Sequence, residues 1–150
     1  MTATTNADDL DEVTIVRVFA APRELVFACM TDPTHLTHFW GPVGVSTPIE
    51  NITVDLRVGG VFETVMVNDE SGETYPSKGV YTEITPPSVL AWEEPSGMAN
   101  RSEFIDLGDG RTEVRIHQTN VPAMYRSPEA QAGMKSSLDR FATYLATQTS

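Results

Sequence analysis

The distribution of hydrophobic positions predicts one strand near the N-terminus, followed by two short helical segments. Residues 13–19 form a short run that is rich in β-branched side chains, which is typical of a strand. Pro22 suits the start of a helix, and we expect that helix to end at Asp32, because the residue before a proline disfavours helical geometry. A second helical turn is expected over residues 34–39.

The middle of the chain changes to a two-residue periodicity, which predicts six further strands. Their expected ranges are 49–54, 59–68, 77–85, 88–94, 100–107 and 111–119. The joints between them are short and rich in glycine, proline and acidic residues, as turns require. Short joints connect antiparallel neighbours, so the six strands should form a meander. With strand 13–19 they make a seven-stranded antiparallel sheet.

The last segment has the pattern of one long amphipathic helix. Ser127 is a suitable N-cap and Pro128 a suitable first helical residue. Apolar side chains then recur every three or four residues, at Ala130, Met134, Leu138, Phe141 and Leu145. A helix over residues 128–148 would be about 31 Å long, enough to cross a seven-stranded sheet. The predicted fold is therefore α+β, with a curved sheet, two short helices and one long C-terminal helix.

The charge of the chain limits its partners. It has 10 basic and 21 acidic residues, a net charge of −11. Nucleic acids and anionic membrane surfaces are bound through lysine and arginine, so we expect neither as a partner. The acidic surface instead leaves open a basic protein partner, although solubility and docking of the less acidic C-terminal segment also explain it. The oligomeric state is left open between monomer and homodimer.

Composition also predicts the domain organisation and compartment. Residues 1–10 are small, polar and acidic, so we expect a disordered tail, and residues 11–150 are long enough for one domain. The start of the chain has no pattern of a secretory signal, and no apolar run approaches the length of a membrane span. The single cysteine, Cys29, excludes an internal disulfide and a cysteine-rich zinc site. We therefore expect a cytoplasmic protein.

Several sequence segments resemble a known family. Residues 16–27, Phe39-Trp-Gly-Pro42, Asp55-Leu-Arg-Val-Gly-Gly-Val-Phe62, Gly79-Val-Tyr-Thr-Glu-Ile84 and 104–112 are similar to the activator of Hsp90 ATPase homologue 1-like family. This family belongs to the START/Bet v 1-like (SRPBCC) superfamily of helix-grip proteins. One departure is Gly133-Met134, where the family often has Gly-Trp. Another is the second, chaperone-contacting domain of the eukaryotic members, for which the chain has no room.

The resemblance implies a cavity between the sheet and the last helix, suited to a small hydrophobic ligand. Alternation along the strands, with the helix stripe, predicts its lining residues. They are Phe62, Thr64, Met66, Leu90, Trp92, Phe104, Ile116, Met134 and Leu138. The same residues would equally suit a solid core without a cavity.

Three sets of residues could carry chemistry. His35 and His38 could share one helix face and bind a metal with Asp32, but we prefer two exposed histidines without metal. Cys29 lies on the apolar side of its helix, without a cation one turn away, and should be a buried, unreactive thiol. His117, Glu113 and Arg115 share the face of their strand that should point to solvent, so a surface ladder of charges is expected.

The strand 77–85 leaves two alternatives. If Tyr81 and Glu83 pointed inward, the buried carboxyl would have a raised pKa and could act as an acid or base. We prefer the outward alternative, with Val80, Thr82 and Ile84 inside. Tyr75 could also place a hydroxyl in the cavity. Arg57 is expected to pair with nearby acids, while Gly60 permits a bend in the sheet.

Three functions remain open, because a fold does not define an activity. The first is non-catalytic binding or transport of a small hydrophobic molecule. The second is a chaperone-linked interaction, as in Hsp90 activators and the stress response. The third is polyketide cyclase- or dehydratase-like catalysis, which would need at least two ionisable groups converging in the cavity. We expect no catalytic residues, no cofactor and no metal.

Overall fold

The structure is a computed structural model that describes residues 11–149, so the tail expected over residues 1–10 lies outside the described residues. Its strands are β1 (Val13–Phe19), β2 (Val45–Ser46), β3 (Ile52–Val54), β4 (Val61–Asn68), β5 (Thr74–Thr85), β6 (Val89–Glu93), β7 (Ala99–Asp106) and β8 (Thr112–Thr119). Its helices are α2 (Arg23–Thr31), α3 (Pro33–Leu36) and α4 (Pro128–Thr149), with single 3₁₀ turns η1 (Ile49–Asn51) and η2 (Ala123–Tyr125). This is the predicted order of strand, two short helices, strands and long helix.

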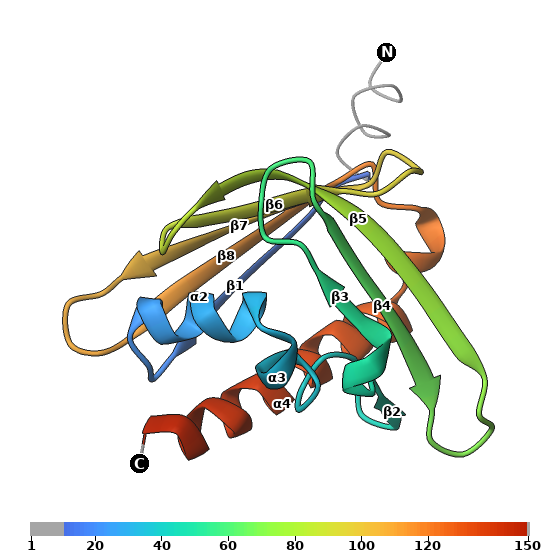
Figure 1. Cartoon of the computed structure of the whole chain (residues 1–150), viewed down its shortest axis with the longest axis horizontal. Coiled ribbons are helices and arrows are strands. Elements are labelled where there is room, and N and C mark those ends of the chain that lie inside the picture. The colour runs from blue at the N-terminus through green and yellow to red at the C-terminus, as the bar shows by residue number, and fades with distance from the viewer. Residues whose placement is uncertain (1–10, 150) are drawn as a thin grey trace.

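The strands form one antiparallel sheet in the order β1-β8-β7-β6-β5-β4-β2, and β3 also pairs with β4. The segment from β3 to β8 is the predicted meander, in which each strand pairs with the next. β1 lies beside β8, with Val13 opposite Gln118 and Phe19 opposite Thr112. The sheet curves, and α2, α3 and α4 all lie on one side of it (Figure 1). The fold is therefore the expected α+β helix-grip arrangement.

The described sheet has eight strands, one more than predicted, because the segment before β4 is divided. Residues 49–51 form η1 instead of the start of a strand, with the Asn51 amide donating to the Pro48 carbonyl at 2.8 Å. The Asn51 side chain also donates to the Val65 carbonyl at 3.2 Å. β2 is a two-residue strand whose Val45 and Ser46 pair with Asn68 and Val67. These short pairings are too brief to leave a periodic signal in the sequence.

In β5, the side chains that face inward differ from those predicted for this segment. The register between β5 and β6 shifts between Tyr81 and Glu83, where a bulge interrupts the alternation. Tyr81 is consequently 1% exposed and inside, while Val80 is 37% exposed and Thr82 is exposed. Glu83 still points outward and Ile84 packs against the core, because the bulge restores the expected phase after it. The placement of Val80 and Thr82 inside was therefore wrong.

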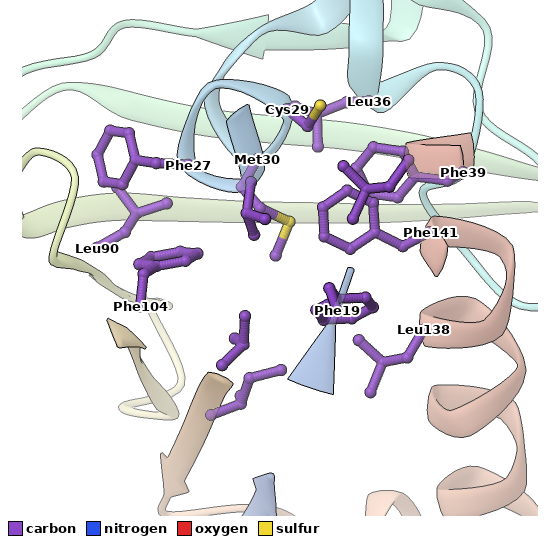
Figure 2. Close-up of a cluster of buried hydrophobic side chains, with 14 of the residues drawn as sticks. Phe19, Phe27, Cys29, Met30, Leu36, Phe39, Leu90, Phe104, Leu138 and Phe141 are labelled. Carbon is purple, nitrogen blue, oxygen red and sulfur yellow. The ribbon is translucent and has the colours of Figure 1, made fainter. Parts of the chain in front are cut away.

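Aromatic and aliphatic side chains together form the core between the sheet and the helices (Figure 2). The Phe141 ring of α4 stacks on Phe39 with centroids 4.3 Å apart and contacts Phe19 of β1 at 4.9 Å. At the other end, Phe27 of α2 meets Phe104 of β7 edge to face at 5.4 Å. The helices are thus held to the sheet by ring contacts that add to the burial of apolar area.

Polar contacts fix α4 across the sheet. The Ser127 hydroxyl accepts from the Ala130 amide at 3.1 Å, which is the predicted N-cap. Arg140 donates to two backbone carbonyls of the loop after α3, those of Gly41 and Pro42, at 2.8 and 3.1 Å, and to the Val45 carbonyl of β2 at 3.0 Å. At the sheet edge, Arg17 of β1 forms an ion pair of 2.7 Å with Asp139. No helix of the described residues is long and apolar enough to cross a membrane.

Candidate functional site

A cavity of about 760 Å³ lies between the inner face of the sheet and α4, and it opens to solvent. The loop after α3 and the first turns of α4 form one wall. The other wall is formed by β4, the start of β5, the turn between β6 and β7, and the inner faces of β7 and β8. Most of the lining side chains are apolar or aromatic, and they include Trp40, Phe62, Met66, Trp92, Ile116 and Met134. The volume falls within the range of small-molecule pockets.

The structure brings seven of the nine predicted lining residues to this cavity. They are Phe62, Thr64, Met66, Trp92, Ile116, Met134 and Leu138. Leu90 and Phe104 lie elsewhere, in the closed core under α2, where both are 1% exposed. Phe27 of α2 meets the Phe104 ring edge to face and belongs with Leu90 to the same buried cluster, which fills this end of the sheet (Figure 2). The cavity therefore begins beyond this closed end of the sheet, where Met30 near the end of α2 is one of its lining residues.

Three aromatic rings, two from the sheet and one from the loop after α3, contact one another in the cavity lining. Phe62 lies edge to face with Trp92 at 5.0 Å and with Trp40 at 5.3 Å. Gly79 makes room for this arrangement, because a Cβ atom there would lie 2.8 Å from Cδ1 of Trp92. The absence of a side chain at this position lets the indole lie close to β5. Trp92 is thus held in the cavity wall by its neighbours on two strands.

A row of amide and hydroxyl groups crosses the part of the sheet wall formed by β7 and β8. Asn100 and Ser102 of β7 are 6% and 1% exposed, and Gln118 of β8 lies opposite Asn100. Gln118 Nε2 donates to Asn100 Oδ1 at 3.2 Å, and Asn100 Nδ2 donates to Ser102 Oγ at 3.3 Å. Alternation places Gln118 on the same face as the predicted Ile116, whereas sequence reasoning missed Asn100 and Ser102. Their spacing of two from the inward Phe104 was the available signal.

Ionisable groups are few in the cavity wall. Glu94 lies two residues after Trp92 and lines the cavity, where burial raises the pKa of its carboxyl. Lys78 and Glu129 also border the cavity, and the ammonium of Lys78 lies 3.6 Å from Glu63. Tyr75 borders it too, as expected, and accepts from Asn68 at 3.4 Å.

Tyr81 does not line the cavity. It stacks on Phe62 with centroids 5.9 Å apart, and its burial raises the pKa of the phenol. Among the described residues, its hydroxyl has no hydrogen-bond partner.

The two histidines of the α3 region lie away from the cavity wall. His35 Nδ1 and the Tyr144 hydroxyl of α4 are 2.5 Å apart, and the His38 ring stacks on Tyr144 at 5.0 Å. Asp32 caps α3 instead of joining them, because its carboxylate accepts from the Thr34 amide at 2.9 Å. That hydrogen bond lowers the pKa of Asp32. Within residues 11–149, no group of three or more His, Cys, Asp or Glu side chains is arranged to hold a metal ion.

Cys29 is fully buried in α2, as predicted. Burial raises the pKa of its thiol to about 11, and the nearby Asp32 contributes in the same direction. The thiol therefore stays protonated at neutral pH, and it has the environment of a structural cysteine.

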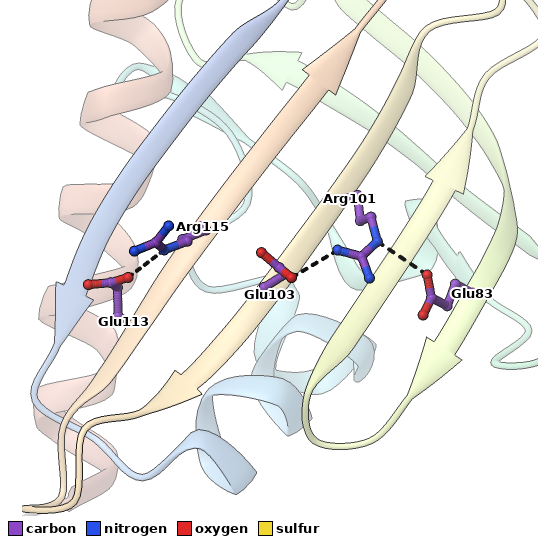
Figure 3. A network of polar contacts seen from close by, with 5 residues as sticks. All are labelled: Glu83, Arg101, Glu103, Glu113 and Arg115. Atoms are coloured by element: carbon purple, nitrogen blue, oxygen red, sulfur yellow. Dashed lines mark hydrogen bonds and ion pairs between the residues drawn. The ribbon is translucent and has the colours of Figure 1, made fainter.

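The outer face of the sheet carries the expected ladder of charges (Figure 3). Arg101 lies between Glu83 and Glu103, at 3.2 and 3.0 Å, and Arg115 contacts Glu113 at 2.6 Å. These groups are on the side of the sheet opposite the cavity. The Arg101–Glu83 pair joins β7 to β5, while the other two pairs lie within β7 and within β8, so these charges pair with one another on the sheet surface.

Two further polar residues also match their expectations. His117 on the same outer face contacts Thr14 at 2.9 Å and Glu12 at 3.1 Å. Arg57 pairs with Asp55 at 2.9 Å, as predicted. At Gly60, a Cβ atom would lie 2.1 Å from the Asp55 carbonyl oxygen, so the tight turn before β4 requires glycine.

Comparisons with known proteins agree with this architecture. The structure is similar to a crystal structure of a protein from Nitrosomonas europaea, with 24% identity, a TM-score of 0.81, and 95% of this chain and 98% of that chain covered. It is also similar to a protein from Chromobacterium violaceum, with 25% identity, a TM-score of 0.79, and 89% and 95% covered. An AHSA1-like protein from Aeromonas hydrophila is similar as well, with 22% identity, a TM-score of 0.78, and 91% of this chain and 93% of that chain covered. A comparison with curated proteins gives no match.

The family assignment covers nearly the whole domain. The model of the family described as activator of Hsp90 ATPase homolog 1-like protein matches residues 20–146, from the residue after β1 to the last turns of α4. The matched range includes every residue that lines the cavity. The chain therefore belongs to the activator of Hsp90 ATPase homolog 1-like family.

Proposed function

We propose that this protein binds or carries a small hydrophobic molecule in the cavity between the sheet and α4. The observation that carries the proposal is the cavity itself, which has about 760 Å³ of space and a lining that is mostly apolar. A folded domain fills its interior closely, and large voids cost stability. A space of this size beside a well-packed core is therefore best explained by an occupant.

The alternatives have less support in the described residues. Cyclase- or dehydratase-like catalysis needs ionisable groups that converge on a reacting atom. This cavity wall is mainly apolar, and of the acidic and basic side chains that border it, Lys78, Glu94 and Glu129, the lysine is 3.6 Å from Glu63. A chaperone-linked interaction through the acidic surface rests on the family description and on charge. On the outer sheet face, however, the carboxylates of Glu83, Glu103 and Glu113 are already paired with Arg101 and Arg115, so they are less available to a basic partner. Binding in the cavity is the function that the geometry favours.

The test is a thermal-shift screen of fatty acids, sterols, flavonoids and aromatic polyketides. A ligand present at 100 times its dissociation constant should stabilise the fold by about 2.7 kcal/mol, which raises the midpoint of unfolding. Tryptophan fluorescence should change with the same ligand, because Trp40 and Trp92 both line the cavity.

A matched pair of variants links the shift to the cavity. Met134→Trp places an indole in the cavity from α4 and should abolish the shift while the protein stays folded. Lys135→Trp adds the same side chain at the next, exposed position and should keep the shift. The proposal is wrong if no compound in the screen raises the midpoint, or if Met134→Trp responds to the ligand as fully as Lys135→Trp does.

A further inference from the structure

The hydrogen bonds of the cavity wall run in one direction and end at an open donor. Gln118 donates to Asn100, and Asn100 donates to Ser102. A serine hydroxyl that accepts one hydrogen bond still has its own proton to donate, and a primary amide has two N–H groups. Among the described residues, neither the Ser102 proton nor the second N–H of Asn100 has an acceptor.

Hydrogen-bond donors without acceptors lower the stability of the fold when they are buried, as these two are. Asn100 and Ser102 are 6% and 1% exposed, and both line the cavity. A buried polar group without a full set of hydrogen bonds destabilises the fold, and apolar side chains of similar shape would avoid that cost. The inner positions that pair with this row on the neighbouring strands are apolar, with Trp92 of β6 opposite Asn100 and Ile116 of β8 opposite Ser102. The polar row therefore interrupts the apolar lining, and a purely apolar ligand would make no hydrogen bond with it.

The charges around the row restrict the chemistry of a partner group. Its three members are neutral, and the cation that borders the cavity, Lys78, lies 3.6 Å from Glu63. The carboxyl groups of Glu94 and Glu129 also border the cavity. A ligand carboxylate would lose its hydration without gaining a cation at the row, and it would add to the negative charge already present. A neutral oxygen atom is the group that fits.

From this row we infer that the cavity recognises an uncharged, mainly apolar molecule through one hydroxyl or carbonyl oxygen. The oxygen accepts from the Ser102 hydroxyl and from the free N–H of Asn100. A ligand hydroxyl can in turn donate to the amide oxygen of Gln118. The inference rests on the proposed function, to which it adds the chemical class of the ligand.

The experiment compares naphthalene, 2-naphthol and 2-naphthoate by equilibrium dialysis, with the fluorescence of each probe as the readout. In a purely apolar cavity, naphthalene would bind more tightly than 2-naphthol, because the hydroxyl would lose water without replacement. With the row in place, 2-naphthol should bind about three- to tenfold more tightly than naphthalene. The anionic 2-naphthoate should bind more weakly than 2-naphthol.

Three variants test whether the preference for 2-naphthol depends on the polar row. Asn100→Leu and Ser102→Ala should each lose the preference for 2-naphthol and keep or improve the binding of naphthalene. Ser137→Ala removes a cavity-lining hydroxyl on α4 outside the row, and it should keep the wild-type preference. Unfolding midpoints of all three variants verify that each is folded; if Asn100→Leu does not fold, Ser102→Ala carries the comparison.

The outcomes separate this inference from the proposed function. If naphthalene binds but 2-naphthol is not preferred, or if the preference survives in Asn100→Leu and Ser102→Ala, recognition of an oxygen by the row is refuted while binding in the cavity stands. If none of the three probes binds, the inference fails together with the cavity as a binding site for compact aromatic molecules.

Discussion

Truncation of Leu138 tests the most important consequence of the fold, that the α4 stripe faces the sheet and borders an empty space. Leu138 is 7% exposed and lines the cavity. Leu138→Ala removes three carbon atoms, which corresponds to about 2.4 kcal/mol of lost burial at about 0.8 kcal/mol per CH₂ group. In a closed core, a further cost arises from the new void. Here the removed atoms only enlarge an open cavity, so we expect a total loss of about 2–3 kcal/mol.

Leu90→Ala is the matched control for this magnitude. Leu90 is 1% exposed in the closed core under α2, where the same truncation creates a new void, so we expect about 3–5 kcal/mol. Urea unfolding measures both losses, with slopes equal to wild type. Thermal midpoints should fall by about 5–10 °C for Leu138→Ala and further for Leu90→Ala. A loss below about 1 kcal/mol at Leu138 would refute the burial of the stripe. An equal or larger loss than at Leu90 would refute an open cavity there.

Three further predictions concern titratable groups. Cys29, whose pKa burial raises to about 11, should not react with iodoacetamide in the native protein at pH 8 and should react after unfolding in urea; rapid native labelling would contradict its burial. Because the pKa of Glu94 is raised in the fold, its ionisation lowers stability as the pH rises above about 4.5, its unperturbed value. Glu94→Gln should therefore be more stable than wild type at pH 7 but not at pH 3, and equal stabilisation at both pH values would exclude this cause. His35 and His38, which contact Tyr144, should retain no zinc after dialysis; stoichiometric zinc that is lost in His38→Ala would overturn this prediction.

Much of the fold was predictable because it depends on local periodicity. The spacing of Leu138, Phe141 and Leu145 predicted the buried side of α4, and all three are buried. Alternation placed Ile116 of β8 inside, where it is 3% exposed, and Val114 on the same face is 1% exposed. These patterns survive in the structure because a helix or a regular strand repeats its geometry, so that one buried position defines the next.

The bulge in β5 is a feature that local periodicity could not predict. Tyr81 and Ile84 are both on the inner side although they are three residues apart, because an extra residue interrupts the pairing with β6. No local signal marks the extra residue, since a bulge arises from how two curved strands fit together. A single shift of this kind reversed the predicted sides of Val80 and Thr82.

Local sequence patterns could not predict how far the cavity extends along the sheet either. Leu90, Trp92 and Phe104 all follow the inward alternation, yet Trp92 lines the cavity while Leu90 and Phe104 lie in closed core. The difference depends on which end of the sheet α2 covers and on the volume of Phe27, which fills that end. Alternation assigns a side chain to a face of the sheet. Whether the space above that face is filled depends on the helices that cross it, and therefore on contacts between residues far apart in the chain.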